Sequence, residues 1–177
     1  MQRTTPMKSI YLLCGLLSIF LLSCWDAGIN PPLVDYYHED IVEAVFRHQF
    51  VHKASGMQQH ASFYFISYYL NGDSVTSSRY IDVSSALVRR FAGTTPQVKN
   101  FSDCEFREYY DGVFDKHTGL QGLLFWIRSV KQTGEYEVEV YGGYYEAGLS
   151  SSGNIYVLKK DGNSTWTVVK DTMIWIS

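Results

Sequence analysis

Acidic and apolar side chains alternate from Glu135 to Tyr141, and this alternation constrains the fold more than any other feature of the chain. Acids stand at Glu135, Glu137 and Glu139, and an apolar residue follows each of them. Successive side chains of a β-strand point to opposite faces, so this order predicts a strand with one wet face and one packed face. The strand is expected to cover residues 135–145.

Other segments rich in aromatic and β-branched residues predict further strands. They are residues 61–70, 122–130, 154–160, 165–171 and 173–176. The later strands are separated by Thr133-Gly134, Ser152-Gly153 and Asp161-Gly162, whose glycines are expected to supply the positive φ of tight hairpin turns. The second half of the chain is therefore predicted to be an antiparallel meander, in which Gly142-Gly143 marks a bulge or a sharp bend that curls the sheet.

Two helices are predicted before the meander. Residues 36–53 carry apolar side chains at helical spacing. A shorter helix at residues 84–91 would be capped by Asp82 or Ser84 and would stop at Gly93. A helix followed by a curved sheet wrapped around it resembles, in element order, the cystatin-like and nuclear-transport-factor-two-like folds. The predicted class is α+β, with the first helix packed on a curved antiparallel β-sheet.

The start of the chain has the layout of an export signal. Arg3 and Lys8 precede an apolar run over residues 10–22, as in a secretory signal peptide. This run is shorter than the roughly 20 apolar residues of a membrane-spanning helix. The motif Leu21-Leu22-Ser23-Cys24 resembles the lipobox of bacterial lipoproteins, which implies that Cys24 is acylated. The expected parts are a removed signal at residues 1–23, a tether at 24–33 and one α+β domain at 34–177.

Lipidation would hold the domain on a membrane of the cell envelope. Two or more acyl chains anchor a protein firmly, since each buried CH2 contributes about 0.8 kcal/mol. Trp25, and not an aspartate, follows Cys24, so the inner-membrane retention signal of enteric bacteria is missing; in an envelope with two membranes the outer one, facing the periplasm, is favoured. The net charge of −3 argues against a nucleic-acid partner. The predicted partners are therefore the lipid bilayer, reached through Cys24, and an envelope protein.

The cysteines exclude a disulfide within the exported domain. Cys14 leaves with the signal and Cys24 carries the lipid, so Cys104 is the only remaining thiol. Its neighbours Asp103 and Glu105 would raise its pKa and make it poorly reactive. Cys104 is expected to be a half-buried structural residue; the alternative is a reactive or intermolecularly paired thiol.

His48 and His52 stand four residues apart on the predicted first helix, a spacing that can place two imidazoles on one metal ion. No glutamate follows His48 as in the zinc proteases, and further ligands would have to come from elsewhere, so no metal and no cofactor is predicted. Enzymes of the folds that the chain resembles often hold a general base between helix and sheet. Candidates for such a base are Tyr37, His48, Tyr64, Tyr68, Asp111, Asp115 and Tyr144.

Aromatic residues make up 16% of the chain, with 14 Tyr, 10 Phe and 4 Trp. An interior of this size needs fewer, and Tyr and Trp are enriched where proteins bind partners. On strands, a Tyr-Tyr pair would project one ring to either face. The candidate binding surface is Tyr68, Tyr69, Tyr144 and Tyr145. The predicted function is a non-catalytic domain that binds a protein or a small apolar ligand through the curved sheet; the alternative is an envelope enzyme with an acid–base pocket between helix and sheet.

The end of the chain carries a second resemblance. Residues 142–150, Gly153, Tyr156, Trp166 and Trp175-Ile176-Ser177 are similar to the closing segment of small bacterial proteins of unknown function. This resemblance implies no activity.

Overall fold

The computed structural model of the protein describes residues 39–52, 60–70, 79–107, 112–148 and 150–177. The chain divides into two units, residues 1–32 and 33–177, and all described residues belong to the second unit. The predicted signal, Cys24 and the tether lie outside the described residues, as do the candidate bases Tyr37 and Asp111.

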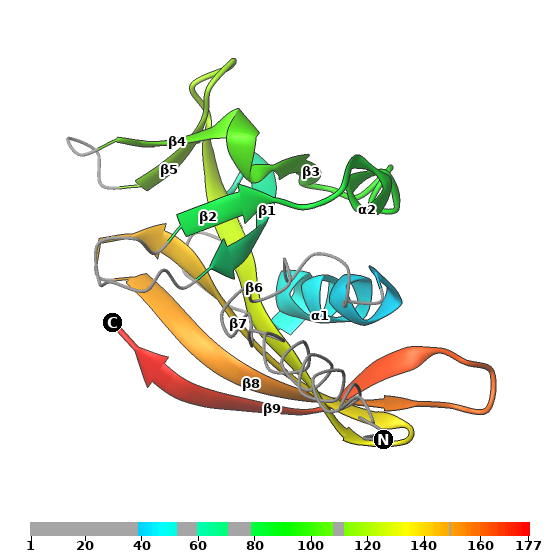
Figure 1. Cartoon of the computed structure of the whole chain (residues 1–177). Coiled ribbons are helices and arrows are strands. Elements are labelled where there is room, and N and C mark those ends of the chain that lie inside the picture. Colours follow the sequence, from blue (N-terminus) through cyan, green and yellow to red (C-terminus); the bar gives the residue numbers. More distant parts are fainter. Residues whose placement is uncertain (1–38, 53–59, 71–78, 108–111, 149) are drawn as a thin grey trace, which may run out of the picture. The chain divides into compact units, whose positions relative to one another are not determined.

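The described residues form an α+β structure that consists mostly of β-sheet (Figure 1). The helices are α1 (Glu39–His52), α2 (Ser85–Arg89) and the 3-10 helix η2 (Phe101–Asp103). The strands are β1 (Phe63–Leu70), β2 (Arg79–Asp82), β3 (Gln97–Asn100), β4 (Cys104–Arg107), β5 (Gly112–Asp115), β6 (Gln121–Gly134), β7 (Glu137–Ala147), β8 (Ser150–Lys160) and β9 (Trp166–Ile176). The predicted class, both predicted helices and the strand-rich second half are confirmed.

The sheet is mixed, so the prediction of a purely antiparallel sheet is wrong. Its order is β2-β1-β6-β7-β8-β9, with β3 also on β1 and the β4–β5 pair joined to the start of β6. Strand β1 runs parallel to both β3 and β6, and the other pairs are antiparallel. Parallel neighbours need a crossover of a dozen or more residues, and the chain between β1 and β6 provides it.

Two of the three predicted turns are misplaced. Ser152-Gly153 lies inside β8, and Gly134 ends β6, so that the chain reverses at Glu135-Tyr136. The turn at Asp161-Gly162 is confirmed, because the Asp161 N–H donates to the Thr165 carbonyl oxygen at 3.0 Å. The positive φ of that turn belongs to Ser164, at 66°, and to none of the predicted turn glycines.

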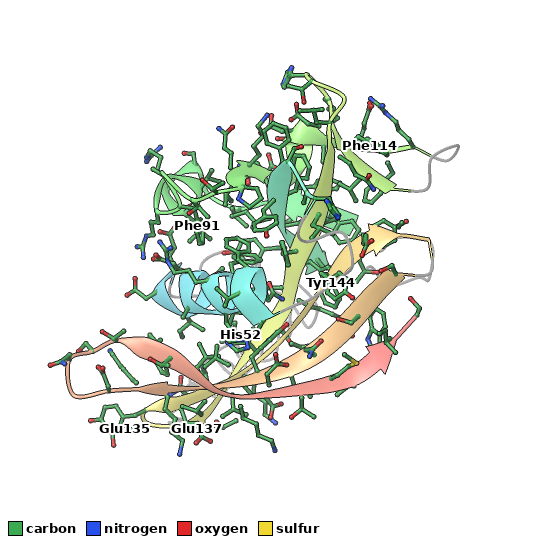
Figure 2. All side chains as sticks on the ribbon, turned by 180° about the vertical axis from the view of Figure 1, so that it is seen from behind. His52, Phe91, Phe114, Glu135, Glu137 and Tyr144 are labelled. Atoms are coloured by element: carbon green, nitrogen blue, oxygen red, sulfur yellow. The ribbon has the colours of Figure 1, made fainter. Side chains whose placement is uncertain are left out.

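The main core lies between α1 and one face of the sheet, here called the helix-covered face (Figures 1 and 2). Strands β6–β9 curve beneath α1, which buries Ile41, Val42, Val45 and Phe46 against them. The strands contribute buried apolar side chains from alternate positions, as the period of two requires. These include Ile66, Phe125, Ile127, Val140, Tyr156 and Leu158.

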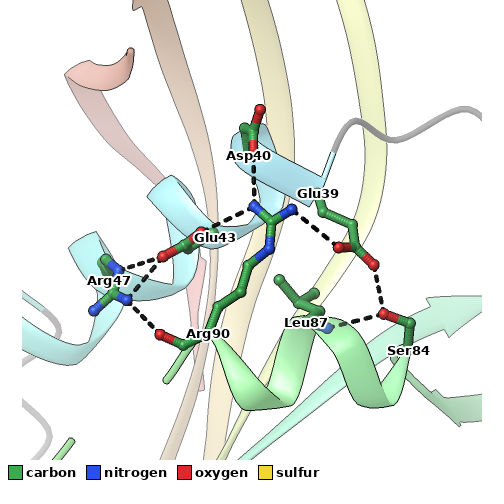
Figure 3. Close-up of polar contacts among 7 residues, drawn as sticks. All are labelled: Glu39, Asp40, Glu43, Arg47, Ser84, Leu87 and Arg90. Atoms are coloured by element: carbon green, nitrogen blue, oxygen red, sulfur yellow. Dashed lines mark hydrogen bonds and ion pairs between the residues drawn. The ribbon is translucent and has the colours of Figure 1, made fainter. Parts of the chain in front are cut away.

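Acidic residues at the start of α1 bind the end of α2 (Figure 3). The Arg90 guanidinium lies 3.2 Å from Glu39 and 3.1 Å from Glu43, and it also pairs with Asp40. Ser84 caps α2 by accepting a hydrogen bond from the Leu87 N–H at 3.0 Å, which confirms one of the two predicted caps. Because these groups are partly exposed to solvent, the ion pairs position the two helices more than they stabilise them.

Candidate functional site

Two tryptophans and two glycines form one row across four strands of the sheet. Trp126 of β6 pairs with Gly143 of β7, Gly143 pairs with Gly153 of β8, and Gly153 pairs with Trp175 of β9. Directly opposed residues of antiparallel strands share a face, so the four lie on the face away from α1, here called the open face.

The two glycines make room for the two indoles. A Cβ atom on Gly143 would lie 2.7 Å from the Trp126 ring, and one on Gly153 would lie 2.1 Å from Nε1 of Trp175. Both distances are shorter than a van der Waals contact, so each indole occupies the place where a side chain would stand. The rings lean toward one another over the glycines and stack, with centroids 6.4 Å apart and planes 18° apart.

Tyrosine side chains from β1, β2 and β7 surround the two indoles, and the group leaves a cavity of about 150 Å³. Trp126 lies at the centre of the group, 5.5 Å from the Tyr69 ring and 5.4 Å from the Tyr141 ring. The Trp175 indole donates a hydrogen bond from Nε1 to the Tyr141 hydroxyl at 2.9 Å. The lining residues are Tyr69, Tyr80, Trp126, Arg128, Tyr141, Tyr145, Ser151 and Trp175.

A β-bulge presents Arg128 to this aromatic pocket. Ile127 pairs with Gly142 and Ser129 pairs with Tyr141, which leaves Arg128 as an extra residue in β6. The sequence predicts a bulge at Gly142-Gly143, and the extra residue lies across from Gly142 in the neighbouring strand. Bulges of this kind redirect a side chain. The Arg128 guanidinium carbon lies 5.4 Å from the Tyr141 ring centre and 6.0 Å from that of Tyr69.

The four predicted surface tyrosines divide between the two faces. Tyr69 and Tyr145 line the aromatic pocket. Tyr68 and Tyr144 are buried on the helix-covered face, as Figure 2 shows for Tyr144, and burial raises the pKa of the Tyr144 phenol. The sequence analysis did not identify Trp126, Trp175 and Arg128 as site residues. The glycines at 142, 143 and 153 lie beside them, but this proximity can be recognised only when the pairing of the strands is known.

A polar cluster lies where α1 meets β8 and β9. His48 Nε2 lies 3.0 Å from Asp171 Oδ2, and Asn154 donates a hydrogen bond to the other Asp171 oxygen at 2.6 Å. Gln49 donates from Nε2 to the Gly143 carbonyl oxygen and to the Tyr156 hydroxyl, at 3.2 and 3.1 Å. The buried Gln49 Oε1 accepts no hydrogen bond from another described residue. Together these contacts fasten α1 to the sheet.

The two histidines that could share a metal ion lie close together on α1. The His48 and His52 rings lie 4.4 Å apart, and within the described residues no group of three His, Cys, Asp or Glu side chains could hold a metal ion.

The candidate bases lie in different parts of the domain. Tyr64 is buried in the main core. Asp115 is buried, which disfavours its charge, but hydrogen bonds from Lys99 at 2.6 Å and from Thr118 lower its pKa to about 2. Among the described candidates, His48 contacts the carboxylate of Asp171, which could orient it.

Cys104 is fully buried, where a half-buried residue is expected from sequence. It packs with Phe65, Val113 and Leu124 in a second apolar cluster beside the aromatic pocket. Burial raises the pKa of its thiol to about 12, and the nearby Asp103 acts in the same direction. The predicted increase is therefore confirmed, with burial as its main cause.

Comparisons with models of protein families, with curated proteins and with solved structures find no match to this chain. In the part of the chain that the structure describes, no helix has the length and apolar character needed to cross a membrane.

Proposed function

We propose that this protein is a lipid-anchored protein of a bacterial envelope whose domain binds a ring-shaped group in the aromatic pocket without catalysis. The anchor rests on the resemblance of Leu21-Leu22-Ser23-Cys24 to a lipobox. The binding role rests on one observation, the row Trp126–Gly143–Gly153–Trp175, which opens a cavity with aromatic walls on the open face.

Several properties of the pocket favour binding over packing. Its walls are rings that present faces and edges, which suits contact with another ring. The volume of about 150 Å³ matches a cavity that holds one benzene ring. Trp175 on the edge strand β9 is still 38% exposed, so the pocket can be entered from solvent.

The domain architecture is proposed to be cystatin-like or nuclear-transport-factor-two-like. Helix α1 comes first, and β6–β9 are consecutive antiparallel neighbours that curve beneath it. Strands β1 and β2 stand between them in sequence and extend the same sheet. This order supports a resemblance in fold. The resemblance does not identify a ligand.

The binding role is tested with benzamide, a neutral ring, by saturation-transfer NMR on the full chain in phosphatidylcholine nanodiscs. We expect transfer to benzamide from the wild-type protein, and its loss in Trp175→Ala, which removes one wall. Val169→Ala changes an exposed residue of the same strand and should keep the signal. If benzamide receives no transfer from the wild type, the binding proposal fails.

The anchor is tested by fractionating cells that express the full chain. Cys24→Ala should move the protein from the membrane fraction to the soluble fraction, because the acylated residue is lost. Cys14→Ala, the same change inside the apolar run, should leave it in the membrane fraction. A Cys24→Ala protein that stays with the membrane refutes the lipid anchor.

An acid–base enzyme is the second candidate, favoured by the contact between His48 and Asp171. Catalysis would require a substrate to reach His48, whose side chain is only 18% exposed, whereas that of His117 is 74% exposed. Diethyl pyrocarbonate modification followed by mass spectrometry compares the two. A binding domain predicts that His48 reacts much more slowly than His117; equal rates would favour the enzyme.

A further inference from the structure

The aromatic pocket carries a positive charge in an otherwise acidic protein. Among the described residues that line it, Arg128 is the only charged one and none is an Asp or Glu, although the whole chain has a net charge of −3. Within the described residues, the Arg128 guanidinium forms no ion pair with a carboxylate and lies against the rings of Tyr69 and Tyr141. Its N–H donors are thus available to an anion that enters from outside.

Two neutral hydrogen-bond donors, the hydroxyl groups of Tyr69 and Tyr80, lie in the same pocket as the Arg128 guanidinium. The hydroxyl groups of Tyr69 and Tyr80 make no hydrogen bond to another described residue, and the two rings lie 4.9 Å apart. Burial raises the pKa of Tyr80, and the neighbouring phenols of Tyr69 and Tyr145 add to the increase. Tyr80 therefore keeps its proton and remains a hydrogen-bond donor.

We propose that Arg128 binds the carboxylate of a small planar ring compound whose ring lies against Trp126 and Trp175. The inference rests on the proposed binding function and names the chemical class of the ligand. A guanidinium presents its donors in a fork that matches the two oxygens of a carboxylate. The bulge at Arg128 fits this role, because it directs the guanidinium over the aromatic walls and leaves Ile127 buried in the core.

The positive charge also excludes the ligands that aromatic cages otherwise attract. Rings of Trp and Tyr bind quaternary ammonium groups through their negative faces. Here Arg128 already occupies the faces of Tyr69 and Tyr141, and it would repel a second cation. The pocket is therefore selective by charge as well as by shape.

Three probes of nearly equal size test the charge preference: benzoate, benzamide and benzamidinium. They are titrated against the full chain in phosphatidylcholine nanodiscs and followed by saturation-transfer NMR. We expect benzoate to bind about tenfold more tightly than benzamide, as a charge-assisted hydrogen bond allows, and benzamidinium to bind more weakly than both. Equal affinities for the three probes would overturn the inference and leave the proposed binding function standing, whereas binding of none would refute both.

Two variants assign the preference to Arg128. Arg128→Gln should lower the affinity for benzoate about tenfold relative to the affinity of the same variant for benzamide, so that the two probes bind it equally, and an unchanged urea-denaturation midpoint shows that the variant is folded. Lys170→Gln removes the same charge from an exposed position outside the pocket, and it should leave the benzoate affinity unchanged. A benzoate preference that survives in Arg128→Gln, or is lost equally in Lys170→Gln, overturns the inference.

Discussion

The two faces of the sheet use the same strands for different purposes. In β6, Phe125 points into the main core beneath α1, and the next residue, Trp126, points into the aromatic pocket. In β7, Tyr144 and Tyr145 divide in the same way. The helix-covered face is closed by α1 and packed with apolar side chains, whereas the open face keeps a cavity, a cation and two glycines.

This difference separates stability from binding within one sheet. Residues on the helix-covered face contribute through burial, so their loss should lower the free energy of unfolding. On the open face, the partly exposed side chains that line the pocket, such as Tyr141 and Trp175, should change binding with little effect on folding when they are lost. Substitutions on each face, together with the pH dependence that Asp115 confers, test this division.

The largest effect is expected from Phe46→Ala in α1. Phe46 is completely buried and contacts the rings of Phe50 and Phe91. Truncation leaves a cavity and should lower the free energy of unfolding by about 3–5 kcal/mol, measured by urea denaturation. Val51→Ala, on the exposed side of the same helix, should change it by less than about 0.5 kcal/mol. Equal losses in both variants would contradict the assignment of the core.

The two glycines of the tryptophan row should differ in cost. A Cβ on Gly143 would lie 1.9 Å from the backbone oxygen of Ser152, which cannot move without opening the sheet, so Gly143→Ala should cost about 1–3 kcal/mol or more. At Gly153 the nearest atoms all belong to the Trp175 indole on an edge strand, which can rotate away.

Gly153→Ala should therefore cost less than about 1 kcal/mol but weaken benzamide binding, because a wall of the pocket is displaced. Gly162→Ala has nothing within 4 Å and serves as the control for both urea denaturation and binding. If Gly143→Ala proves as mild as Gly153→Ala, the close contact with Ser152 does not constrain the sheet.

An acid-dependent loss of stability is expected from Asp115. Its pKa is about 2 in the folded protein, below its ordinary value of 3.8, so the stabilisation is complete above pH about 4 and is lost as the pH falls toward 2. Asp115→Asn should lower the free energy of unfolding at pH 7 by about 1–3 kcal/mol and flatten this part of the pH profile. Glu135→Gln, which removes an exposed carboxylate, should retain the wild-type profile.

The smallest effect is expected from Tyr141→Phe on the open face. It removes the hydroxyl that accepts the Trp175 indole hydrogen bond, at an exposed site, and should cost about 0.5 kcal/mol. The clearer readout is faster hydrogen exchange of the Trp175 indole N–H, measured by NMR. Tyr136→Phe, at an exposed turn, should leave that exchange rate unchanged.

Local patterns predicted the elements that are long and periodic. The apolar spacing of α1, the Ser84 cap and Gly93, with its φ of 82°, are all present in the structure. The strands β2–β5 were not predicted individually, because each has only four residues and shows no clear alternation. The turn predicted at Ser152-Gly153 is misplaced because the missing side chain of Gly153 makes room for an indole and does not serve a turn.

The candidate site could be predicted only in part. Tyr69 and Tyr145 follow from the rule that neighbouring residues of a strand face opposite ways. The contact between His48 and Asp171 joins residues from α1 and β9, and no spacing in the sequence relates them. The same holds for Arg128, since a bulge is defined by the partner strand as much as by its own.

Short-range periodicity in the sequence specified the two helices and the long strands, and which side chains of each long strand share a face. The tertiary structure alone decided that β1 lies parallel to β6 and that Trp126 and Trp175 meet over Gly143 and Gly153. Strand register arises from pairing between distant segments, and a shift by one residue would turn every side chain to the other face. The aromatic pocket therefore exists only in the paired sheet.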